Sequence, residues 1–367
     1  HSQSPPVYQY HPLFREFLLS RARDSYPADE ISRIQQSAAL LLEESGQEYD
    51  AVRLLGEAQD WGNLIRLIIS RAHALMVQGR AKTLQEWIGL IPEEILEGQP
   101  WLLYWLAVCK QRFSPSESIG QLFERVLRSF QSQENAEGII LAWIGILEFY
   151  LWRDSKHLDY WIEWFHKYIH NHLSYPSPKI EARVAFYMAL SLSYRRLHHA
   201  DTMSWLERSI SLSREIGDDD LRMLIFLVAG SYYQRIGDLA KINQVIREIE
   251  EIAKSSSISP STLILYKVLR ASLYRFMTGD KELHLKLVNE GLEMSQTSGI
   301  YTWDHMLFSE GAVGCLDKGD LGGAGEFLRK MKPLFATRPR SAFFYRFTYA
   351  QYYALLGELP QAVEHAR

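Results

Sequence analysis

A two-residue break, glycine followed by an acid, recurs in the second half of the chain and constrains the fold more than any other feature. The four breaks are Gly237-Asp238, Gly279-Asp280, Gly319-Asp320 and Gly357-Glu358, at steps of 42, 40 and 38 residues. Glycine suits the left-handed conformation that ends many helices, because it has no Cβ to clash. Each break therefore predicts a turn between two helices.

The residues before each break repeat as well. A small residue stands seven positions before each glycine, at Gly230, Ser272, Ala312 and Ala350. A small side chain there would let one helix backbone approach the next. Helix-turn-helix units with a period near forty residues are typical of an α-solenoid.

The segment from Leu221 to Ser255 gives the clearest view of one unit. Its first part, to Ile236, is apolar on most faces and predicts a largely buried helix. Its second part carries apolar residues at steps of three and four, which predicts one apolar stripe on a charged helix. Such a hairpin needs neighbours of the same kind to cover its apolar faces. We therefore expect an all-α fold, a right-handed α-solenoid of tetratricopeptide-like helical hairpins. Less regular copies precede it, with Ser191 in the small position of the nearest one.

Composition narrows the classes of function. The chain has 367 residues, 47% of them hydrophobic, and a net charge of −4, so bulk electrostatics do not indicate nucleic-acid binding. The apolar run near 138–147 is too short to span a bilayer, and no signal peptide is visible. Cys109 and Cys315 lie far apart in the chain, which fits a reducing, cytoplasmic setting without a structural disulfide.

The first hundred residues predict five helices, at 13–23, 31–45, 48–58, 61–78 and 83–91. Glycine or proline follows most of them, and both residues stop helices. In the first helix we expect one inward apolar face, made of Leu13, Phe14, Phe17 and Leu18.

Three stretches of this region carry a family resemblance. They are YQYHPLFREFLLSRAR, AALLLEESGQEYDAVRLLGEAQDWGNLIRLI and MVQGRAKTLQEWIGLIPEEIL. They resemble the region that follows the ATPase in MalT-type regulators, the large ATP-binding LuxR-type transcription activators of the STAND class. The matching positions are His11, Leu13, Phe14, Phe17, Leu18, Gly46, Ala51, Ala58, Asp60, Trp61, Pro92, Glu93 and Glu94. The chain departs at Gln59, where the family usually has glycine. The motifs cover roughly the first hundred residues, and the repeat period covers the remainder.

The resemblance implies that this chain is one part of a longer polypeptide with several domains. Residues 1–27 would end the upstream ATPase and winged-helix module, 28–98 would form a helical arm, and 99–367 would be a sensor domain truncated at its C-terminus. The chain contains no phosphate-loop motif, so ATP is expected upstream and no cofactor is expected in this chain. The upstream ATPase would be its partner within the polypeptide.

Aromatic residues are dense between 143 and 175 and offer one candidate site. Trp152, Trp161 and Trp164 could form a stacking platform for sugars or planar effectors, because their faces suit apolar ring faces. In MalT-type proteins the repeat domain receives the inducer. The alternative is packing between helices, since aromatic stripes on helices are usually core.

The groove of the solenoid offers a second candidate site. In ordinary tetratricopeptide hairpins the first helix lines the concave surface, and here positions two, three and six before each glycine should face inward. The residues selected are Arg195, Arg196, Ser231, Gln234, Arg235, Phe276, Met277, Asp317 and Gln351. Arg195, Arg196 and Arg235 would make a basic patch for a carboxylate, a phosphate or an acidic partner segment. The alternative is a solvated set of arginines beside ordinary acids.

No arrangement of residues predicts an enzyme or a metal site. His166 and His170 have ligand spacing, but no acid or cysteine completes a site. Asp218, Asp219 and Asp220 are expected to cap the next helix. We therefore expect a regulatory sensor whose groove binds a small molecule or a protein and controls the upstream ATPase. A protein-interaction scaffold without a small-molecule ligand is the alternative, and an unrecognised hydrolase is the weakest hypothesis.

Overall fold

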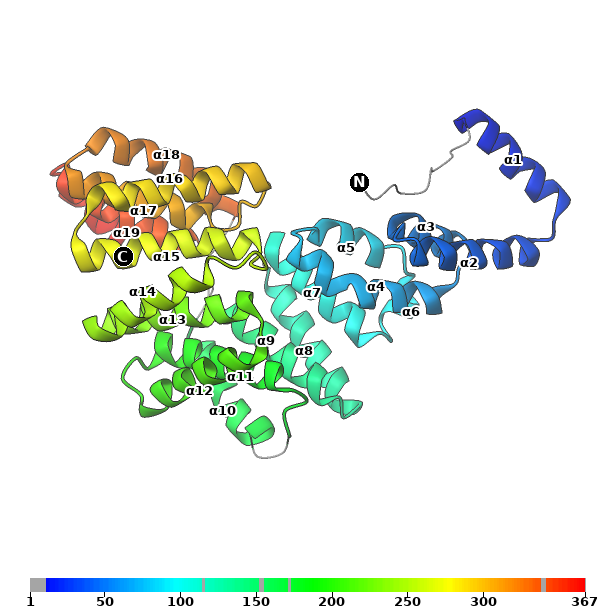
Figure 1. The fold of residues 1–367 in the computed structure, drawn as a ribbon, viewed down its shortest axis with the longest axis horizontal. Helices are drawn as coiled ribbons and strands as arrows, with labels where there is room; N and C mark the ends of the chain where they lie inside the picture. Colours follow the sequence, from blue (N-terminus) through cyan, green and yellow to red (C-terminus); the bar gives the residue numbers. More distant parts are fainter. Residues whose placement is uncertain (1–10, 114–115, 152–154, 171–172, 338–340, 367) are drawn as a thin grey trace. The chain divides into compact units, whose positions relative to one another are not determined.

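The computed structural model describes residues 11–113, 116–151, 155–170, 173–337 and 341–366. Within these residues the chain forms twenty α-helices and one π-helical turn, without any strand (Figure 1). The expectation of an all-α solenoid of helical hairpins is confirmed. Among the described residues, no helix has the length and apolar character needed to cross a membrane.

The chain forms two compact units. The first extends to Leu102, apart from Val77–Gly79, and the second takes up the chain from Leu103. Buried leucine and isoleucine side chains such as Leu64, Leu67 and Ile68 form the core of the first unit. Five of its helices lie within a few residues of the expected ranges: α1 (Pro12–Ser25), α2 (Ala28–Glu44), α3 (Glu48–Glu57), α4 (Trp61–Val77) and α5 (Ala81–Ile88). They are followed by α6 (Glu93–Leu96) and the start of α7 (Pro100–Phe113), for which no range was predicted.

The expectation that the apolar face of α1 points inward is wrong. Leu13 is 76% exposed and Phe17 is 57% exposed, and Phe14 and Leu18 are exposed as well. An amphipathic helix is buried only where a second apolar face lies opposite it. In the described part of this unit, α1 contacts chiefly α2 and only at a few positions.

The second unit is built from helical hairpins, with a single helix and a π-helical turn between the first two. Each helix packs mainly on its partner in the hairpin. The first helix of one hairpin also contacts the first helix of the next, as α13 does with α15 and α17 with α19. The elements are α8 (Glu117–Ser132), α9 (Ala136–Leu151), α10 (His157–Phe165), η1 (His166–His170), α11 (Pro178–Arg195), α12 (Ala200–Ile216), α13 (Asp219–Ile236), α14 (Leu239–Ile252), α15 (Pro260–Thr278), α16 (Lys281–Ser298), α17 (Asp304–Lys318), α18 (Leu321–Thr337), α19 (Ser341–Leu355) and α20 (Leu359–Ala366).

The glycine-acid breaks form turns as predicted, and the structure shows why both residues are needed. The four glycines have φ between 66° and 80°, a conformation that costs a residue with a Cβ about 1–2 kcal/mol. At the three breaks that contain aspartate, the acid then caps the next helix. The carboxylate of Asp238 accepts from the backbone N–H of Lys241 at 3.0 Å, and that of Asp320 accepts from Gly323 at 2.8 Å. One residue ends a helix and the next one starts another.

The small residue before each break permits close helix packing. At Gly230, an added Cβ would come within 3.0 Å of Leu273 on α15 and 3.2 Å of Val245 on α14. Leu273 and Val245 belong to one core cluster of this unit, together with the isoleucine stripe of α14. The expected apolar stripe is thus the contact face of α14, where Ile242 and Ile249 are fully buried.

Candidate functional site

A cavity of about 470 Å³ lies where α8, α9 and α10 meet in the second unit. We call it the aromatic pocket, because π faces make up much of its wall. Its lining residues are Glu124, Leu127, Arg128, Gln131, Tyr150, His157, Tyr160, Trp161 and Trp164.

Glycines let α8 and α9, which form two walls of the aromatic pocket, pack closely together. An added Cβ at Gly145 of α9 would lie 2.3 Å from the ring of Phe123 on α8, and one at Gly120 of α8 would lie 2.7 Å from Phe149 on α9. Such distances are far below van der Waals contact, so only glycine permits this approach. The two helices therefore form a closely packed base that holds Glu124, Arg128 and Tyr150 in place.

A buried tryptophan positions the third wall. The indole Nε1 of Trp143 on α9 donates to the backbone carbonyl of Trp161 on α10 at 3.0 Å. The Trp143 ring also stacks on Phe165, with ring centroids 4.8 Å apart. These two contacts fix α10 at both ends of one helical turn, and they set the direction of the Trp161 side chain.

The aromatic side chains of α10 form a continuous surface. The ring centroids of Trp161 and Trp164 lie 5.6 Å apart, and those of Tyr160 and Trp161 lie 5.1 Å apart. Tyr160 is 61% exposed, whereas Trp161 is 7% exposed and forms part of the buried wall. On the other side, His157 stacks on Tyr150 at 4.8 Å with nearly parallel rings.

A few polar groups stand among these rings. Glu124 and Arg128 lie one turn apart on α8, and the hydroxyl of Tyr150 is 3.5 Å from a carboxylate oxygen of Glu124. Arg128 makes no ion pair with any residue that the structure describes. Apolar and aromatic walls with a few placed polar groups are typical of small-molecule sites.

The structure brings two of the three predicted tryptophans into this pocket. Trp161 and Trp164 both line it, and Trp152 lies outside the described residues. Sequence reasoning missed Glu124, Arg128 and Gln131. Their spacing of four and three places them on one face of α8, but nothing in the sequence showed that this face would meet α10.

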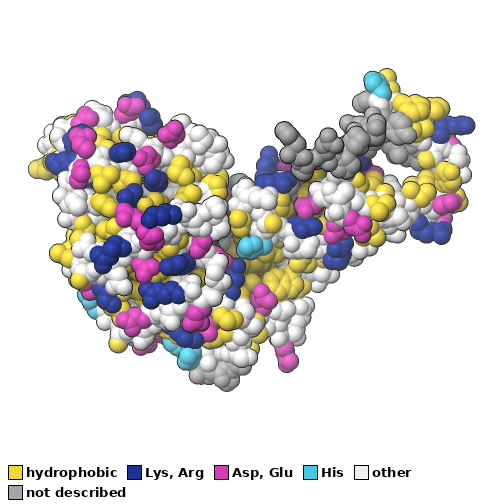
Figure 2. Space-filling model, viewed as in Figure 1, with side chains coloured by type: hydrophobic (Ala, Val, Ile, Leu, Met, Phe, Trp, Pro, Cys, Tyr) yellow, Lys and Arg dark blue, Asp and Glu magenta, His cyan; other side chains and the backbone are white. Residues whose placement is uncertain are grey.

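The predicted basic patch is partly neutralised. The guanidinium of Arg195 donates twice to one carboxylate oxygen of Asp159 on α10, at 2.5 and 3.1 Å, and Arg196 lies 3.6 Å from the other oxygen. Hydrogen bonds from Arg195 hold the pKa of Asp159 below its ordinary value. Acidic and basic side chains also alternate over the visible face of this unit (Figure 2).

Arg235 behaves differently from the other two arginines. Its Nη1 donates to the carbonyl oxygen of Ser193 at 2.9 Å, its Nη2 donates to the hydroxyl of the same serine at 3.0 Å, and its Nε donates to the carbonyl of Ser231. Its guanidinium also lies 5.1 Å over the ring of Tyr194. It makes no ion pair with a carboxylate in the described part of the chain, and burial lowers its pKa. Arg235 therefore ties α13 to α11 and keeps an uncompensated charge.

The remaining predicted groove residues lie along the first helices. Phe276 and Gln351 are exposed, and Gln234 and Met277 are half-buried. Asp317 is held by Arg275, at 3.2 Å, so it links α17 to α15. At the sixth residue before the break the outcome differs between repeats: Gln351 is exposed and Ser231 half-buried, whereas Leu273 and Val313 are buried in the core, so the rule for inward positions is wrong at those two. Packing between hairpins occupies that position.

The other candidate clusters have structural roles. The carboxylate of Asp218 accepts from the backbone N–H of Leu221 at 2.9 Å, so the capping prediction is confirmed. Asp219 accepts hydrogen bonds from the hydroxyls of Ser255 and Ser257. In the described residues, no group of histidine, cysteine and acidic side chains could hold a metal ion.

Comparison with known proteins identifies the fold. No family model and no curated protein matches the sequence. Among solved structures, the apo form of the quorum sensor NprR from B. thuringiensis is similar, with a TM-score of 0.61 and 14% identity over 88% of this chain and 92% of that one. A STAND protein with a tetratricopeptide repeat sensor from Pyrococcus horikoshii is similar with a TM-score of 0.56 and 15% identity. That match covers 97% of this chain and 56% of the other. At these identities the likeness shows a tetratricopeptide-like fold.

Proposed function

We propose that the second unit is the sensor domain of a signal-transduction ATPase regulator and that its effector binds in the aromatic pocket. The pocket is the observation that carries the proposal, because it joins several aromatic side chains to a carboxylate and a guanidinium in one cavity. The effector class that fits is a small ring-shaped molecule with hydroxyl or carbonyl groups, such as a sugar or a planar metabolite. The apolar ring face would stack on Trp161 and Trp164, and Glu124 and Arg128 would bind the polar edge.

Signalling requires that the effector prefer one arrangement of the chain over another. A ligand that binds two conformational states equally does not change the equilibrium between them, however tightly it binds. The pocket spans α8, α9 and α10, so an occupant would favour one placement of α10 on α9. Asp159 of α10 is bound to Arg195 of α11, and a shift of α10 would reach the next hairpin through that contact. In the proposal, residues 28–98 pass the change to an ATP-binding module of the same polypeptide, which regulates transcription in the cytoplasm.

A panel of sugars and planar metabolites, followed by thermal unfolding, tests the proposal. A true effector raises the melting temperature in proportion to the logarithm of its concentration. Replacing Tyr160 by alanine should weaken binding by about tenfold, because a stacked aromatic contact contributes roughly 1–1.5 kcal/mol. Tyr49→Ala is the matched control, since Tyr49 is as exposed as Tyr160 and lies outside the pocket. A stabilising ligand that binds equally well to Y160A, W164A and R128M would contradict the proposed site.

A protein-interaction scaffold is the second candidate function. The observation that favours it is the row of exposed groups on successive first helices, which includes Phe276, with 47% exposure, and the uncompensated guanidinium of Arg235. This row would bind a segment of a partner protein that carries an acidic residue for Arg235 and an apolar residue for Phe276. A scaffold predicts no hit from the metabolite panel and a specific partner in a pull-down that F276A and R235M abolish.

A further inference from the structure

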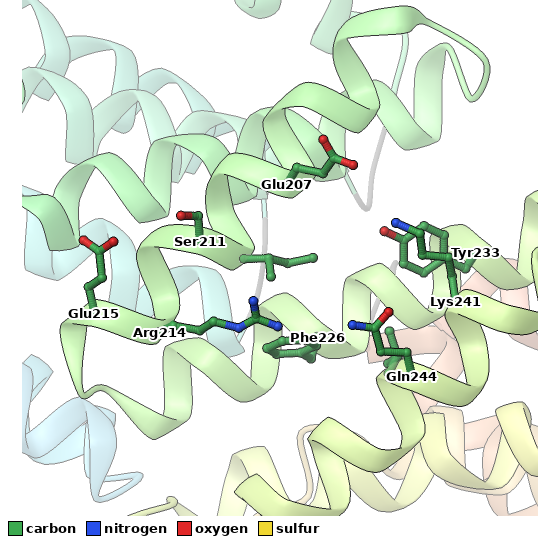
Figure 3. A pocket seen from close by; sticks show the side chains of 10 residues that line it. Glu207, Ser211, Arg214, Glu215, Phe226, Tyr233, Lys241 and Gln244 are labelled. Carbon is green, nitrogen blue, oxygen red and sulfur yellow. The ribbon is translucent and has the colours of Figure 1, made fainter.

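A second cleft lies among α12, α13 and α14, two hairpins beyond the aromatic pocket in sequence. Its volume is about 380 Å³, and α12 and α14 form its walls (Figure 3). Phe226 and Tyr233 of α13 form an apolar floor, and both are nearly fully buried. Ligand pockets have volumes of roughly 300–1,000 Å³, so this cleft suits a small occupant.

Three charged groups at the cleft make no ion pair with any residue that the structure describes: Glu207 and Glu215 of α12 and Lys241 of α14. Glu215 lies at the end of the cleft near Arg214, whereas Lys241 lies at the opposite end (Figure 3). Two nearby arginines of α12, by contrast, do form ion pairs. Arg208 binds Glu181 at 2.6 Å, and Arg214 binds Glu248 at 3.0 Å.

The floor of the cleft holds the lysine without neutralising it. The ammonium of Lys241 lies 5.4 Å from the centre of the Tyr233 ring, a cation–π contact. Burial raises the pKa of Tyr233 to about 12, so the phenol stays neutral at physiological pH, and its hydroxyl lies 3.9 Å from the sulfur of Met203. The carboxylate of Asp238 is engaged in capping the backbone N–H of Lys241. The ammonium therefore remains available to an anion.

The far end of the cleft is closed by ion pairs between its two walls. Arg214 of α12 binds one oxygen of Glu248 on α14, and Arg222 of α13 binds the other at 3.1 Å. The guanidinium of Arg214 also lies 5.9 Å over the ring of Phe226. These contacts bound the length of an occupant, because the Arg214–Glu248 ion pair connects the two walls at that end.

We propose that this cleft binds a free amino acid with an apolar side chain, with its carboxylate on Lys241 and its ammonium on Glu207. A zwitterion complements the unpaired cation Lys241 and the unpaired anion Glu207 above the apolar floor, while Glu215 lies at the other end of the cleft, beside Arg214. A ligand with a single charge can pair with only one of the two protein charges, so it gives up one of the two charge-assisted contacts and binds more weakly. Because the walls belong to consecutive hairpins, the bound amino acid ties α12 to α14. The proposal is independent of the ring-shaped effector at the aromatic pocket.

Isothermal titration calorimetry on the whole chain tests this proposal, with each standard amino acid as a separate probe. At least one apolar amino acid should bind, and its N-acetyl and carboxamide derivatives should each bind about tenfold more weakly or worse, because each lacks one charge. Glu207→Gln and Lys241→Met should weaken binding by roughly tenfold to a hundredfold. The matched controls are Glu251→Gln and Lys254→Met, an exposed ion pair outside the cleft, and they should bind as the unchanged chain does.

Three results would overturn the proposal. The first is no binding of any amino acid at about 10 mM, an affinity below that of a useful sensor. The second is equal binding of the free amino acid and its blocked derivatives. The third is unchanged binding in E207Q and K241M. Circular dichroism of each variant shows that it is folded, and since Glu207 is exposed and Lys241 half-buried, both variants should fold.

Discussion

Replacing His284 by leucine should loosen three helices at once. The imidazole is fully buried on α16, and its two nitrogens lie 3.1 Å from the carbonyl oxygen of Ala271 on α15 and 2.8 Å from that of Glu310 on α17. Carbonyl oxygens only accept, so both nitrogens must carry a hydrogen for both bonds to form. The side-chain carboxylate of Glu310 lies 3.6 Å from Nε2 and forms an ion pair with the imidazole when the imidazole is protonated.

The expected cost follows from these contacts. A hydrogen bond that involves a charged group contributes about 1.5–3 kcal/mol, and removing one partner of a buried ion pair costs about 3–5 kcal/mol. The two figures describe overlapping contacts, so they are not added, and we expect a loss of roughly 3–5 kcal/mol. Burial raises the pKa of Glu310, so this carboxylate takes up a proton more readily once the imidazole is gone, which limits the loss.

Native-state hydrogen exchange of the α15–α17 amides is the suitable assay. Repeat arrays do not always unfold in one step, so a local free energy of opening is more informative than a global one. His170→Leu is the matched control, because His170 is exposed. The double variant H284L/E310Q should recover part of the loss. A loss below about 1 kcal/mol, or an equal loss in the control, would refute the buried ion pair, since that is the range of a surface pair.

Three further predictions concern the packing, the turns and the acid stability of the second unit. Gly145→Ala should destabilise it by about 1–3 kcal/mol in urea unfolding, because the added Cβ would meet Phe123 at 2.3 Å, and a neutral effect would contradict the close packing of α8 on α9. Asp320→Ala should cost about 0.5–2 kcal/mol through the lost cap, and no change would show that glycine alone makes the turn. The pKa of Asp159 lies below its usual 3.8, so its pair with Arg195 stabilises the fold above that pH and is lost as the pH falls through the folded pKa. Arg195→Met should remove this acid-side dependence from a plot of stability against pH, and an unchanged slope would count against the pair.

Much of the fold could be predicted from the sequence, because its turns need particular backbone chemistry. Gly237 and Gly279 mark left-handed residues that other side chains avoid, and the acids after them mark helix starts. The spacing of these glycine-acid breaks predicted the repeat period of the solenoid. The exposed apolar face of α1 could not be predicted, since periodicity identifies an apolar stripe and not what covers it.

The candidate site could be predicted only in part. Aromatic density pointed to α10, but α9 is buried on nearly every face, so periodicity could not separate the buried Trp143 from the pocket residue Trp164. The ion pairs between hairpins were missed. Arginine recurs at Arg195, Arg235 and Arg275, at steps of forty residues, and each of the three contacts a neighbouring helix outside its own hairpin, so this spacing was a readable signal for such contacts.

Fluorine NMR of the chain labelled with 5-fluorotryptophan tests the central claim most directly. The chain has ten tryptophans, and single Trp→Phe variants assign their resonances. When a stabilising ring-shaped ligand is added, the account predicts that the resonances of Trp161 and Trp164 shift in proportion to occupancy, and that of Trp303, which immediately precedes α17, does not. A ligand that shifts Trp303 and leaves Trp161 and Trp164 unchanged would contradict the account.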